Sequence, residues 1–263
     1  MNFNARQFVV PCVGALVDEL GNAGLDPVGH EIVVVDNASV DGSADAVRAL
    51  SPGVSLVANR TNLGFGRAAN QGFRKTSGEY VLVLNPDVTV AAGALQKMVQ
   101  FMDINRDVGL LLPKLLNADG SVQSSCRTFY TLPVLFLRRT PLGAIFSDAR
   151  SVRLHLMADW DHAEVREVDW GLGAAMLLRR SAFGQEAPFD ERFFIYFEDV
   201  DLCVRLKESG WKVIYFPEAP MIHHHLRQSA AGWWNKARFE HLKSLIKFIY
   251  KHRGLKPRKT AAP

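Results

Sequence analysis

The sequence has few cysteines, no long apolar run and no leader-like beginning. Cys12, Cys126 and Cys203 are the only cysteines among 263 residues, and no two of them form a C-x-x-C pair. An odd and scattered set predicts neither a disulfide framework nor a thiolate metal site, and it fits a reducing cytosol. The apolar runs fall short of the roughly 20 residues that a spanning helix needs, and residues 1–10 lack the pattern of a secretory leader. We therefore expect a cytoplasmic protein.

The net charge of +4 is unevenly distributed along the chain. Residues 235–263 contain nine of the 31 basic residues and only one of the 27 acidic residues, Glu240. The remaining residues, 1–234, therefore carry 22 basic and 26 acidic side chains. A nucleic-acid-binding protein would place basic residues over the body of its fold, so we expect no nucleic-acid partner.

The basic segment 235–263 also has an amphipathic pattern, which predicts a C-terminal helix followed by a tail. The apolar positions at helical spacing are Phe239, Leu242, Leu245, Ile246, Ile249 and Tyr250, and lysines 236, 243, 247 and 251 fall elsewhere around the helix. Docking on the domain with a solvated outer face explains this pattern, and so does peripheral contact with the inner face of the cytoplasmic membrane. Both interpretations stay open.

Residues 1–234 alternate between short β-rich runs and helical patterns. We predict strands near 31–36, 54–58, 80–85, 109–116, 174–179 and 212–216, and helices near 5–20, 42–50, 66–76, 91–104, 199–209 and 235–253. This alternation predicts an α/β fold with a mainly parallel sheet and helices on both faces. The stretch 126–168 has two prolines and no clear period, which indicates a long excursion that serves as a binding loop or lid.

Two strand ends carry residues suited to binding a nucleotide, because ligands gather at the carboxyl ends of parallel strands. The run "EIVVV" stops at Asp36 and Asn37. Asp36 is placed to accept a hydrogen bond from the imide N–H of a pyrimidine base or from a ribose hydroxyl. A turn with a capping aspartate is the alternative. In "NRTNLGFGRAANQG", a glycine-rich helix start offers amide groups to a phosphate, although such turns are also common without a ligand. Its candidate residues are Asn62, Gly64, Gly66, Arg67 and Asn70.

A third strand end, "EYVLVLNPDVTV", raises the question of why a carboxylate follows an apolar strand. The chain turns at Asn85 and Pro86 and presents Asp87 near the predicted diphosphate. Mg²⁺ and Mn²⁺ prefer oxygen ligands and commonly share one carboxylate with diphosphate oxygens. Asp87 is therefore a candidate metal ligand, with a turn-stabilising aspartate as the alternative.

Five motifs in order resemble family 2 inverting glycosyltransferases of the GT-A fold, in particular their bacterial rhamnosyltransferase-like branch. They are "VDNASVDGS", "NLGFGRAANQG", "LVLNPDV", "VDWGLGAAMLLRR" and "FDERFFIYFEDVDLCVRLKESGW", and the resemblance covers roughly residues 2–250. It implies that Asp36 binds the nucleobase and that Asp87 ends a D-x-D-like metal motif. It also implies that Glu198 and Asp199 are the catalytic acidic pair, with Asp199 as the base. The aromatic surroundings of this pair favour a raised pKa.

The resemblance also implies further site residues. The family has a histidine shortly before a serine at "PMIHHHLRQS", which favours His224 as a metal ligand, with His223 as the substitute and His225 also adjacent. A neutral imidazole suits this role. In "REVDWGLGAAM", Asp169 and Trp170 are candidates for binding the acceptor sugar, and core packing is the alternative for Trp170.

The chain departs from the family at its beginning. Family members open with a full strand, and only "MNFN" stands here, with Asn4 matching its donor-binding end. The first strand is thus largely missing, and because it would be central, its neighbours would have unpaired ladder groups. We expect either a true start upstream or an impaired chain. The domain prediction is a GT-A domain over 1–234, with a nucleotide-sugar-binding half at 1–105 and an acceptor-binding half at 106–234.

The sequence therefore predicts an inverting, metal-dependent glycosyltransferase that uses Mg²⁺ or Mn²⁺. The resemblance favours transfer of rhamnose or another deoxyhexose from a dTDP donor to a cell-envelope glycan or lipid-linked acceptor. One alternative is a sugar nucleotidyltransferase. Such an enzyme should have, directly after its first strand, a loop that is rich in glycine and in Arg or Lys and that binds a triphosphate. The other is a degenerate, non-catalytic binding protein. Retention of Asp36, Asp87 and Asp199 argues against the second alternative.

Overall fold

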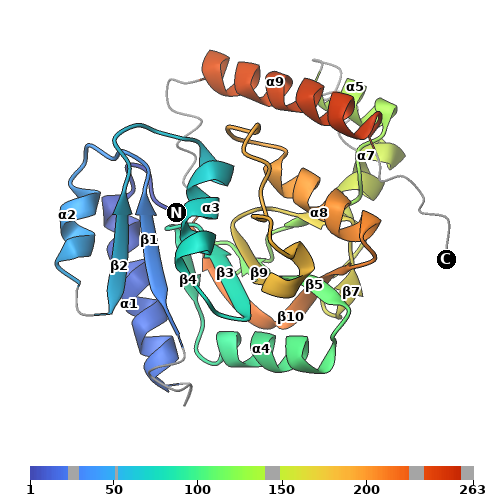
Figure 1. Ribbon diagram of the computed structural model, residues 1–263. Coiled ribbons are helices and arrows are strands. Elements are labelled where there is room, and N and C mark those ends of the chain that lie inside the picture. The colour runs from blue at the N-terminus through green and yellow to red at the C-terminus, as the bar shows by residue number, and fades with distance from the viewer. Residues whose placement is uncertain (23–29, 51–52, 140–148, 225–233, 256–263) are drawn as a thin grey trace.

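The computed structural model describes residues 1–22, 30–50, 53–139, 149–224 and 234–255. Strands and helices alternate along the chain, as Figure 1 shows. The strands are β1 (Ile32–Asp36), β2 (Val54–Ala58), β3 (Tyr80–Leu84), β4 (Val88–Val90), β5 (Val108–Leu116), β6 (Cys126–Arg127), β7 (Arg166–Glu167), β8 (Trp170–Gly171), β9 (Ala175–Arg179) and β10 (Lys212–His223). The helices are α1 (Arg6–Asn22), α2 (Ser43–Arg48), α3 (Phe65–Lys75), α4 (Ala94–Ile104), α5 (Leu132–Arg139), α7 (Arg150–Leu156), α8 (Glu198–Glu208) and α9 (Trp234–His252).

The strands form a mixed sheet within the predicted α/β fold. The main sheet has the order β3-β9-β5-β10-β4, and β1 and β2 form a separate parallel pair. Strands β5 and β10 are parallel, but β9 lies between β3 and β5 and runs antiparallel to both. The pairing is therefore mixed where the sequence predicted a mainly parallel sheet, because a run of apolar residues does not reveal strand direction.

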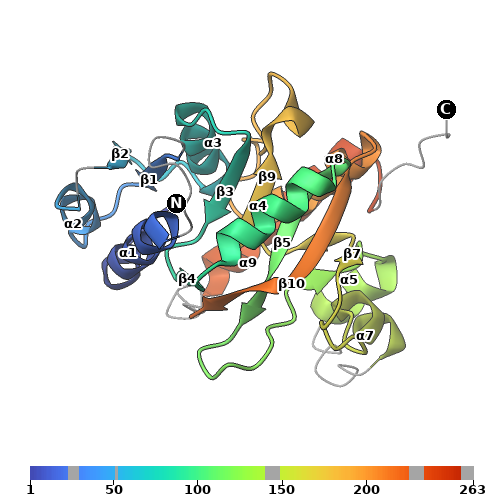
Figure 2. The ribbon, with the colours of Figure 1, turned by 90° about the horizontal axis from the view of Figure 1, so that it is seen from below.

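Helices cover both faces of the sheet, as predicted. Helix α4 crosses one face, and α8 and α9 lie on the other (Figures 1 and 2). Two apolar clusters follow this division: one contains Met98 and Met102 of α4, and the other contains Leu202 of α8 and Phe248 of α9. Strands between the two clusters are apolar on both sides, which explains the continuous run "VGLLLPKLL" in β5.

Strand β10 extends beyond its predicted end at residue 216 and reaches His223. A register shift between Phe216 and Pro220 lets the strand bend and then pair with β4 in the antiparallel direction, with His223 opposite Val88. This extension brings the histidine segment to the carboxyl end of β3.

The excursion 126–168 contains more regular structure than the sequence predicted. It includes β6, helices α5 and α7, and β7, and residues 140–148 lie outside the described part. In the described residues no helix combines the length and the apolar character needed to cross a bilayer.

Candidate active site at the carboxyl edge of the sheet

Asp36 ends β1 inside a small network of hydrogen bonds. Its Oδ1 accepts from Asn2 Nδ2 at 2.7 Å, and its Oδ2 accepts from the amide of Ser39 at 3.0 Å. The Asp36 side chain is buried, and each carboxylate oxygen has a further lone pair. Asn4 closes the same loop, because its Oδ1 accepts from the amide of Val40 at 2.9 Å. Both residues predicted to bind the sugar-nucleotide donor, Asp36 and Asn4, therefore bond to the loop after β1, from the end of β1 and from the segment before α1.

Asn37 joins the loop after β1 to the loop before α3. Its Nδ2 donates to Asn62 Oδ1 at 2.8 Å and to the carbonyl of Gly64 at 3.2 Å. Its Oδ1 accepts from the amide of Leu63 at 2.9 Å. The side chains of Asn37 and Asn62 thus fix the relative position of two predicted donor-binding loops.

The glycines before α3 have a packing reason that the sequence did not reveal. Gly64 has a φ of +85°, and a Cβ at this position would lie 2.3 Å from the carbonyl oxygen of Phe194. The amide of Phe65 donates to that carbonyl at 2.8 Å. A Cβ on Gly66 would approach Phe189 at 3.2 Å. The glycines therefore admit segment 189–194, and their contact with a diphosphate stays a prediction.

Asn70 and Arg67 hold the same segment. Asn70 is fully buried, donating to the carbonyl of Phe189 at 2.7 Å and accepting from its amide at 3.0 Å. Arg67 Nε lies 3.1 Å from Glu191 Oε2. These two predicted donor-binding residues thus position the chain that leads into α8, and their direct contact with a donor stays a prediction.

The side chain of Asp87 lies next to His223, whereas the sequence favoured His224 as the second metal ligand. The Nε2 atom of His223 lies 3.5 Å from Asp87 Oδ2, and both side chains are nearly buried. The ring of His224 instead faces Thr89, with Nε2 3.4 Å from Oγ1. Alternation along β10 explains the difference, because neighbouring side chains in a strand point to opposite faces. His225 lies outside the described residues.

The Asp87 and His223 pair fits a divalent cation. The Nδ1 atom of His223 lies 2.8 Å from Gln123 Oε1, and the Gln123 amide is oriented by its Nε2 bond to Asn117 Oδ1 at 3.2 Å. The Nδ1 atom therefore carries the proton, so in the neutral ring the Nε2 lone pair faces a carboxylate oxygen. Two facing acceptors favour a cation between them. In the described residues no group of three or more His, Cys, Asp or Glu side chains gathers for a metal, so further ligands would come from the substrate and water.

Glu198 and Asp199 begin α8 after a strained turn. Tyr196 and Phe197 have φ values of +67° and +68°, which are costly for residues with a Cβ. The turn brings the acidic pair to the helix start, where Asp199 Oδ1 accepts from the amide of Val200 at 2.8 Å and Oδ2 from that of Gly173 at 3.3 Å. Two amide bonds thus fix the orientation of the Asp199 carboxylate.

The two carboxyls of this pair differ in their tendency to ionise. Burial raises the pKa of Asp199 to about 6, and the amides of Val200 and Gly173 limit the rise. Burial and the nearby Asp199 raise the pKa of Glu198 well above its ordinary value. The Oε2 atom of Glu198 is buried and has no hydrogen-bond partner among the residues that the structure describes. The amides of Val200 and Gly173 thus favour the ionised form of Asp199, whereas burial and the charge of Asp199 disfavour the ionised form of Glu198.

Backbone contacts bring Asp87 and Asp199 to the same edge of the sheet. The amide of Asn85, two residues before Asp87, donates to the carbonyl of Ala174 at 2.8 Å. The neighbouring residue Gly173 is the one whose amide bonds Asp199. The carboxyl end of β3 and the first turn of α8 therefore meet at residues 173–174.

The first two residues of the chain connect Asp36 to this edge. The amino group of Met1 donates to the carbonyl of Leu84 at the end of β3, at 3.0 Å, while Asn2 bonds Asp36. Asp36, Asp87 and Asp199 thus lie along one edge, which is the arrangement that a sugar-nucleotide site requires.

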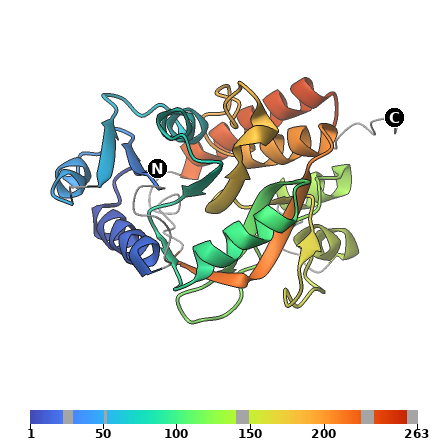
Figure 3. The same ribbon diagram turned by 60° about the horizontal axis from the view of Figure 1, so that its bottom comes forward.

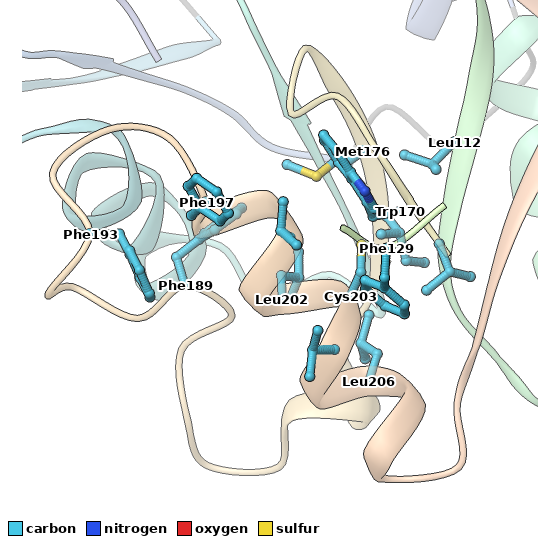
Figure 4. Packing of buried hydrophobic residues seen from close by; sticks show 14 of the residues in the cluster. Leu112, Phe129, Trp170, Met176, Phe189, Phe193, Phe197, Leu202, Cys203 and Leu206 are labelled. Atoms are coloured by element: carbon cyan, nitrogen blue, oxygen red, sulfur yellow. The ribbon is translucent and has the colours of Figure 1, made fainter. Parts of the chain in front are cut away.

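The two candidate acceptor residues have other contacts in the structure. Trp170 is 5% exposed and lies beside Met176, Leu112 and Phe129 in the core, as Figure 4 shows. Core packing, which the sequence left open as its alternative role, is therefore what the structure records. The Oδ2 atom of Asp169 accepts from the amide of Phe129 at 2.8 Å, and its contact with an acceptor stays a prediction.

Comparisons with known proteins show the family of the chain. The family model "Glycosyl transferase family 2" matches residues 1–123. The N-acetylglucosaminyl-diphospho-decaprenol L-rhamnosyltransferase of Mycobacterium tuberculosis is 31% identical over 234 residues, which cover 85% of this chain and 76% of the relative. The chain belongs to glycosyltransferase family 2. The rhamnosyltransferase WbbL of Escherichia coli is 29% identical over 213 residues, covering 74% of the glycosyltransferase described here and 73% of WbbL.

The fold of this glycosyltransferase also matches solved structures. The mannosyltransferase PcManGT from Pyrobaculum calidifontis, in complex with GDP-Man and Mn²⁺, aligns with a TM-score of 0.62 at 17% identity. The alignment covers 100% of this chain and 64% of that chain. At this identity the match shows the fold alone, and it confirms the GT-A fold that the motifs implied.

Three residues that hold the site were missed from the sequence. Asn2 bonds Asp36, and Gly173 bonds Asp199. His252 lies 2.7 Å from Asp201, the next acidic residue of α8. Each partner is far away in sequence, so spacing within one motif carried no signal for it. The one local signal is for Gly173: the glycines of "WGLG", residues 170–173, allow another segment to approach the backbone closely.

Proposed function

We propose that this glycosyltransferase moves rhamnose or another deoxyhexose from a nucleoside-diphosphate donor, with dTDP favoured, to a cell-envelope glycan or lipid-linked acceptor. Two relatives named as rhamnosyltransferases support the sugar. The mycobacterial relative's name gives N-acetylglucosaminyl-diphospho-decaprenol, which supports a lipid-linked acceptor. The observation that carries the catalytic proposal is the Asp199 carboxylate, which has a raised pKa and is held by two amides at the edge that also carries Asp87.

In this proposal Asp199 is the general base of one inverting displacement. Its carboxylate takes the proton of the acceptor hydroxyl as that oxygen attacks the anomeric carbon. A new carbon–oxygen bond forms, and the bond between the anomeric carbon and the diphosphate oxygen breaks, so the nucleoside diphosphate leaves with the electron pair. Attack from the face opposite the leaving group inverts the anomeric configuration. Burial disfavours the ionised form of Glu198, which limits the negative charge beside the incoming hydroxyl.

The donor lies along residues 1–105 in this proposal. Asp36 accepts from the base or the ribose through its remaining lone pairs, and Asn4, Asn37 and Asn62 shape the two loops around it. Gly64, Gly66, Arg67 and Asn70 act through segment 189–194, which they hold in place. Asn85 and Asp87 lead from β3 toward the diphosphate.

Asp87 and His223 would hold the divalent metal, which when bound stabilises the charge that grows on the departing diphosphate. The contact between His223 Nδ1 and Gln123 supports this assignment, because it orients the ring so that Nε2 faces Asp87.

A matched pair of histidine variants tests the metal assignment. We expect His223→Gln to weaken Mn²⁺-dependent binding of dTDP by about 10–100-fold, the usual effect of losing a metal-site group, and His224→Gln to change it by no more than about twofold. Calorimetry with and without Mn²⁺ measures both. Equal losses in the two variants would contradict the assignment of the metal to His223. A loss only in His224→Gln would favour His224, the histidine that the sequence favoured.

A nucleotide screen tests the function as a whole. We expect dTDP with Mn²⁺ to raise the melting temperature more than UDP or GDP, and we expect removal of the metal to reduce the shift. At dTDP near 100 times its Kd the stabilisation should reach about 2.7 kcal/mol, or roughly 5–10 °C for a chain of this size. No shift with any nucleotide supports the non-catalytic binding protein, and a preference for nucleoside triphosphates supports the nucleotidyltransferase.

We also propose that α9 rests on an anionic membrane, which would bring the site to a lipid-linked acceptor at the inner face of the cytoplasmic membrane. Its exposed face has an apolar stripe at helical spacing formed by Phe239, Leu242, Ile246, Ile249 and Tyr250. Lys243, Lys247 and Arg253 are exposed beside the stripe. Helix α9 lies on the outside of the molecule, away from α4 (Figure 1). Apolar residues flanked by basic ones are typical of helices that lie in a membrane interface.

Vesicle binding tests this surface. We expect the double variant Leu242→Gln/Ile246→Gln to bind vesicles containing phosphatidylglycerol at least tenfold more weakly, because two apolar side chains leave the interface. The matched control is Val40→Gln/Ile104→Gln, which changes two highly exposed residues away from α9 and should leave binding intact. Sedimentation with the vesicles measures both variants. Equal binding by the wild type and the α9 double variant would contradict the membrane assignment.

A further inference from the structure

Lys114 and Arg127 carry two positive charges on the side of the sheet that α8 covers. Lys114 follows Leu112 by two positions in β5, and alternate residues of a strand share one face. Leu112 belongs to the apolar cluster that contains Leu202 of α8, so Lys114 lies on that side. Arg127 ends β6, whose other residue, Cys126, is buried in the same cluster. Both basic residues are half-buried, so an anion gains more from meeting them than from meeting charges in open water.

The turn after β5 brings these two side chains together. The chain returns along β5 as an antiparallel hairpin, in which the amide of Gln123 donates to the carbonyl of Leu115 at 2.8 Å. The register of this hairpin places Ser124 opposite Lys114. The carbonyl of Ser124 accepts from Arg127 Nη1 at 2.5 Å. The guanidinium of Arg127 is thus held beside the backbone that faces Lys114.

The buried ring of His162 lies near both bases and is affected by their charges. The carbonyl of His162 accepts from the hydroxyl of Tyr215 at 3.2 Å, and Tyr215 lies in β10, beside β5. Burial lowers the pKa of His162, and the charges of Arg127 and Lys114 lower it further. A hydrogen bond to a backbone carbonyl and the smaller effect of Asp161 act in the opposite direction. The two cations are therefore close enough together to act on one imidazole.

Asp199 lies next to the same segment. The amide of Leu172 donates to the carbonyl of Ser125 at 3.0 Å, and the amide of Gly173 donates to Asp199 Oδ2 at 3.3 Å. Burial raises the pKa of Asp199 to about 6, and the charge of Arg127 is one of the effects that limit the rise. An anion bound to the Arg127 guanidinium would therefore lie close to the hydroxyl that Asp199 deprotonates in the proposed reaction.

Lys114 forms no hydrogen bond or ion pair with the residues that the structure describes. A half-buried ammonium group without a counter-charge is costly, and a bound anion reduces that cost. We propose that Lys114 and Arg127 form an acceptor-diphosphate subsite, which binds the diphosphate that links the acceptor sugar to its lipid. This assignment rests on the proposed function and names the part of the acceptor that the two bases recognise. The fork of an arginine matches phosphate oxygens, and a lysine adds a second positive charge.

The diphosphate of the donor meets a different set of groups in the proposed function. His223, one of the two residues assigned to the metal, shares a strand face with Met221, which packs in the cluster of α4. Lys114 lies on the other face, where α8 packs. In an acceptor linked through a diphosphate, the attacking hydroxyl and the diphosphate belong to the same sugar ring. Cations beside Asp199 therefore suit the diphosphate of the acceptor.

A water-soluble prenyl diphosphate tests the subsite without sugar transfer. Calorimetry measures the binding of geranyl diphosphate to the full chain with Mg²⁺ and excess dTDP, and geraniol controls for the lipid part. We expect Lys114→Gln and Arg127→Gln each to weaken binding at least about tenfold, because each removes a charge-assisted hydrogen bond to phosphate. The matched control, Lys97→Gln, should change binding by no more than about twofold. Lys97 is exposed on α4, the green helix that lies across the sheet from α8 and α9 in Figure 3.

The affinity for dTDP separates this subsite from the proposed function. In both subsite variants it should stay within a few-fold of the wild-type value, because the subsite does not hold the donor. A loss of dTDP affinity as large as the loss of geranyl diphosphate affinity would place both bases at the donor diphosphate and overturn the subsite. Geranyl diphosphate binding that is unchanged in both variants would also overturn it. A wild type that binds no dTDP would contradict the proposed function, and the dependence of geranyl diphosphate binding on the two bases would then decide the subsite by itself.

The ring signals of His162 give a second readout, which a purely structural role of the two bases would not produce. NMR identifies these signals through their loss in His162→Gln. Bound geranyl diphosphate should raise the pKa of His162, because its negative charge offsets the charges of Arg127 and Lys114. An unchanged pKa at saturation would place the anion elsewhere and overturn the proposal. Lys114→Gln loses no hydrogen bond or ion pair with the described residues, so this variant decides the test if Arg127→Gln does not fold.

Discussion

Replacing Asp199 with asparagine is expected to abolish sugar transfer and to stabilise the folded protein at neutral pH. The raised pKa of about 6 means that the ionised carboxylate is less favourable in the folded chain than in the unfolded chain. The contribution of this carboxyl to stability is therefore fully present below its unfolded pKa of about 3.9 and is lost as the pH rises through about 6. Neutral asparagine of nearly the same shape avoids that loss, which is on the order of 1–3 kcal/mol at pH 7–8. Its single acceptor oxygen keeps the shorter bond from Val200 and gives up the longer one from Gly173, which offsets about 1 kcal/mol of the gain.

The loss of activity in this variant follows from the missing proton acceptor. An amide cannot take the hydroxyl proton, so kcat/KM should fall by about 10²–10⁴-fold or more, while dTDP affinity stays within a few-fold. In the wild type, kcat/KM should rise with pH through about 6, because the base works only when it is deprotonated. Turnover by Asp199→Asn at the wild-type rate, or a flat wild-type profile from pH 5 to 7, would remove Asp199 from this role.

A matched aspartate variant separates these effects from a general effect of losing a charge. Asp45 is highly exposed in α2 and pairs only with Arg48 in the described contacts. Asp45→Asn should therefore leave the melting temperature and kcat/KM unchanged within experimental error, since exposed ion pairs contribute about 0–1 kcal/mol to stability. Thermal unfolding at pH 5 and pH 8 completes the comparison, because stabilisation by Asp199→Asn should be present at pH 8 and reduced at pH 5.

Local patterns predicted the elements well because each main strand and helix carries its own signal. The run "EIVVVD" predicted 31–36 and forms β1 at Ile32–Asp36, and the segment predicted at 235–253 forms α9 at Trp234–His252. Strand direction had no such signal. The apolar run of β9 reads the same in either direction, and only its pairing with β3 and β5 makes it antiparallel.

The sequence indicates candidate site residues at strand ends, but it does not indicate the contacts that depend on pairing between distant segments. Asp36, Asp87 and Asp199 were identified from their motifs, and the structure brings them to one edge. Which of His223 and His224 faces Asp87 depends on the register of β10 against β4, which places His223 opposite Val88. No local pattern in "IHHH" distinguishes one histidine from the next, so this choice needed the structure.

Asp201 illustrates a further limit, because the dipole of α8 is the only reason that the local sequence gives for a third acidic residue at the start of this helix. In the structure it is fully buried and anchors α9. Its Oδ1 lies 2.6 Å from Lys251 Nζ and 2.7 Å from His252 Nε2, and its Oδ2 lies 2.9 Å from Arg205 Nε. Burial alone would raise the pKa of Asp201, but the hydrogen bond from His252 and the charges of Arg205 and Lys251 outweigh it and hold the pKa below its ordinary value.

Asp201→Asn should therefore destabilise the protein, whereas Asp199→Asn should stabilise it. The variant leaves buried positive groups without their counter-charge, a loss of about 3–5 kcal/mol, or roughly 10 °C in melting temperature. The contribution of Asp201 is present above its unfolded pKa and is lost as the pH falls through its lowered folded pKa, so the variant should lose less stability in acid than the wild type. Urea unfolding measures both effects. An unchanged midpoint would mean that the apolar contacts of Leu245 and Phe248 hold α9 without the ion pairs.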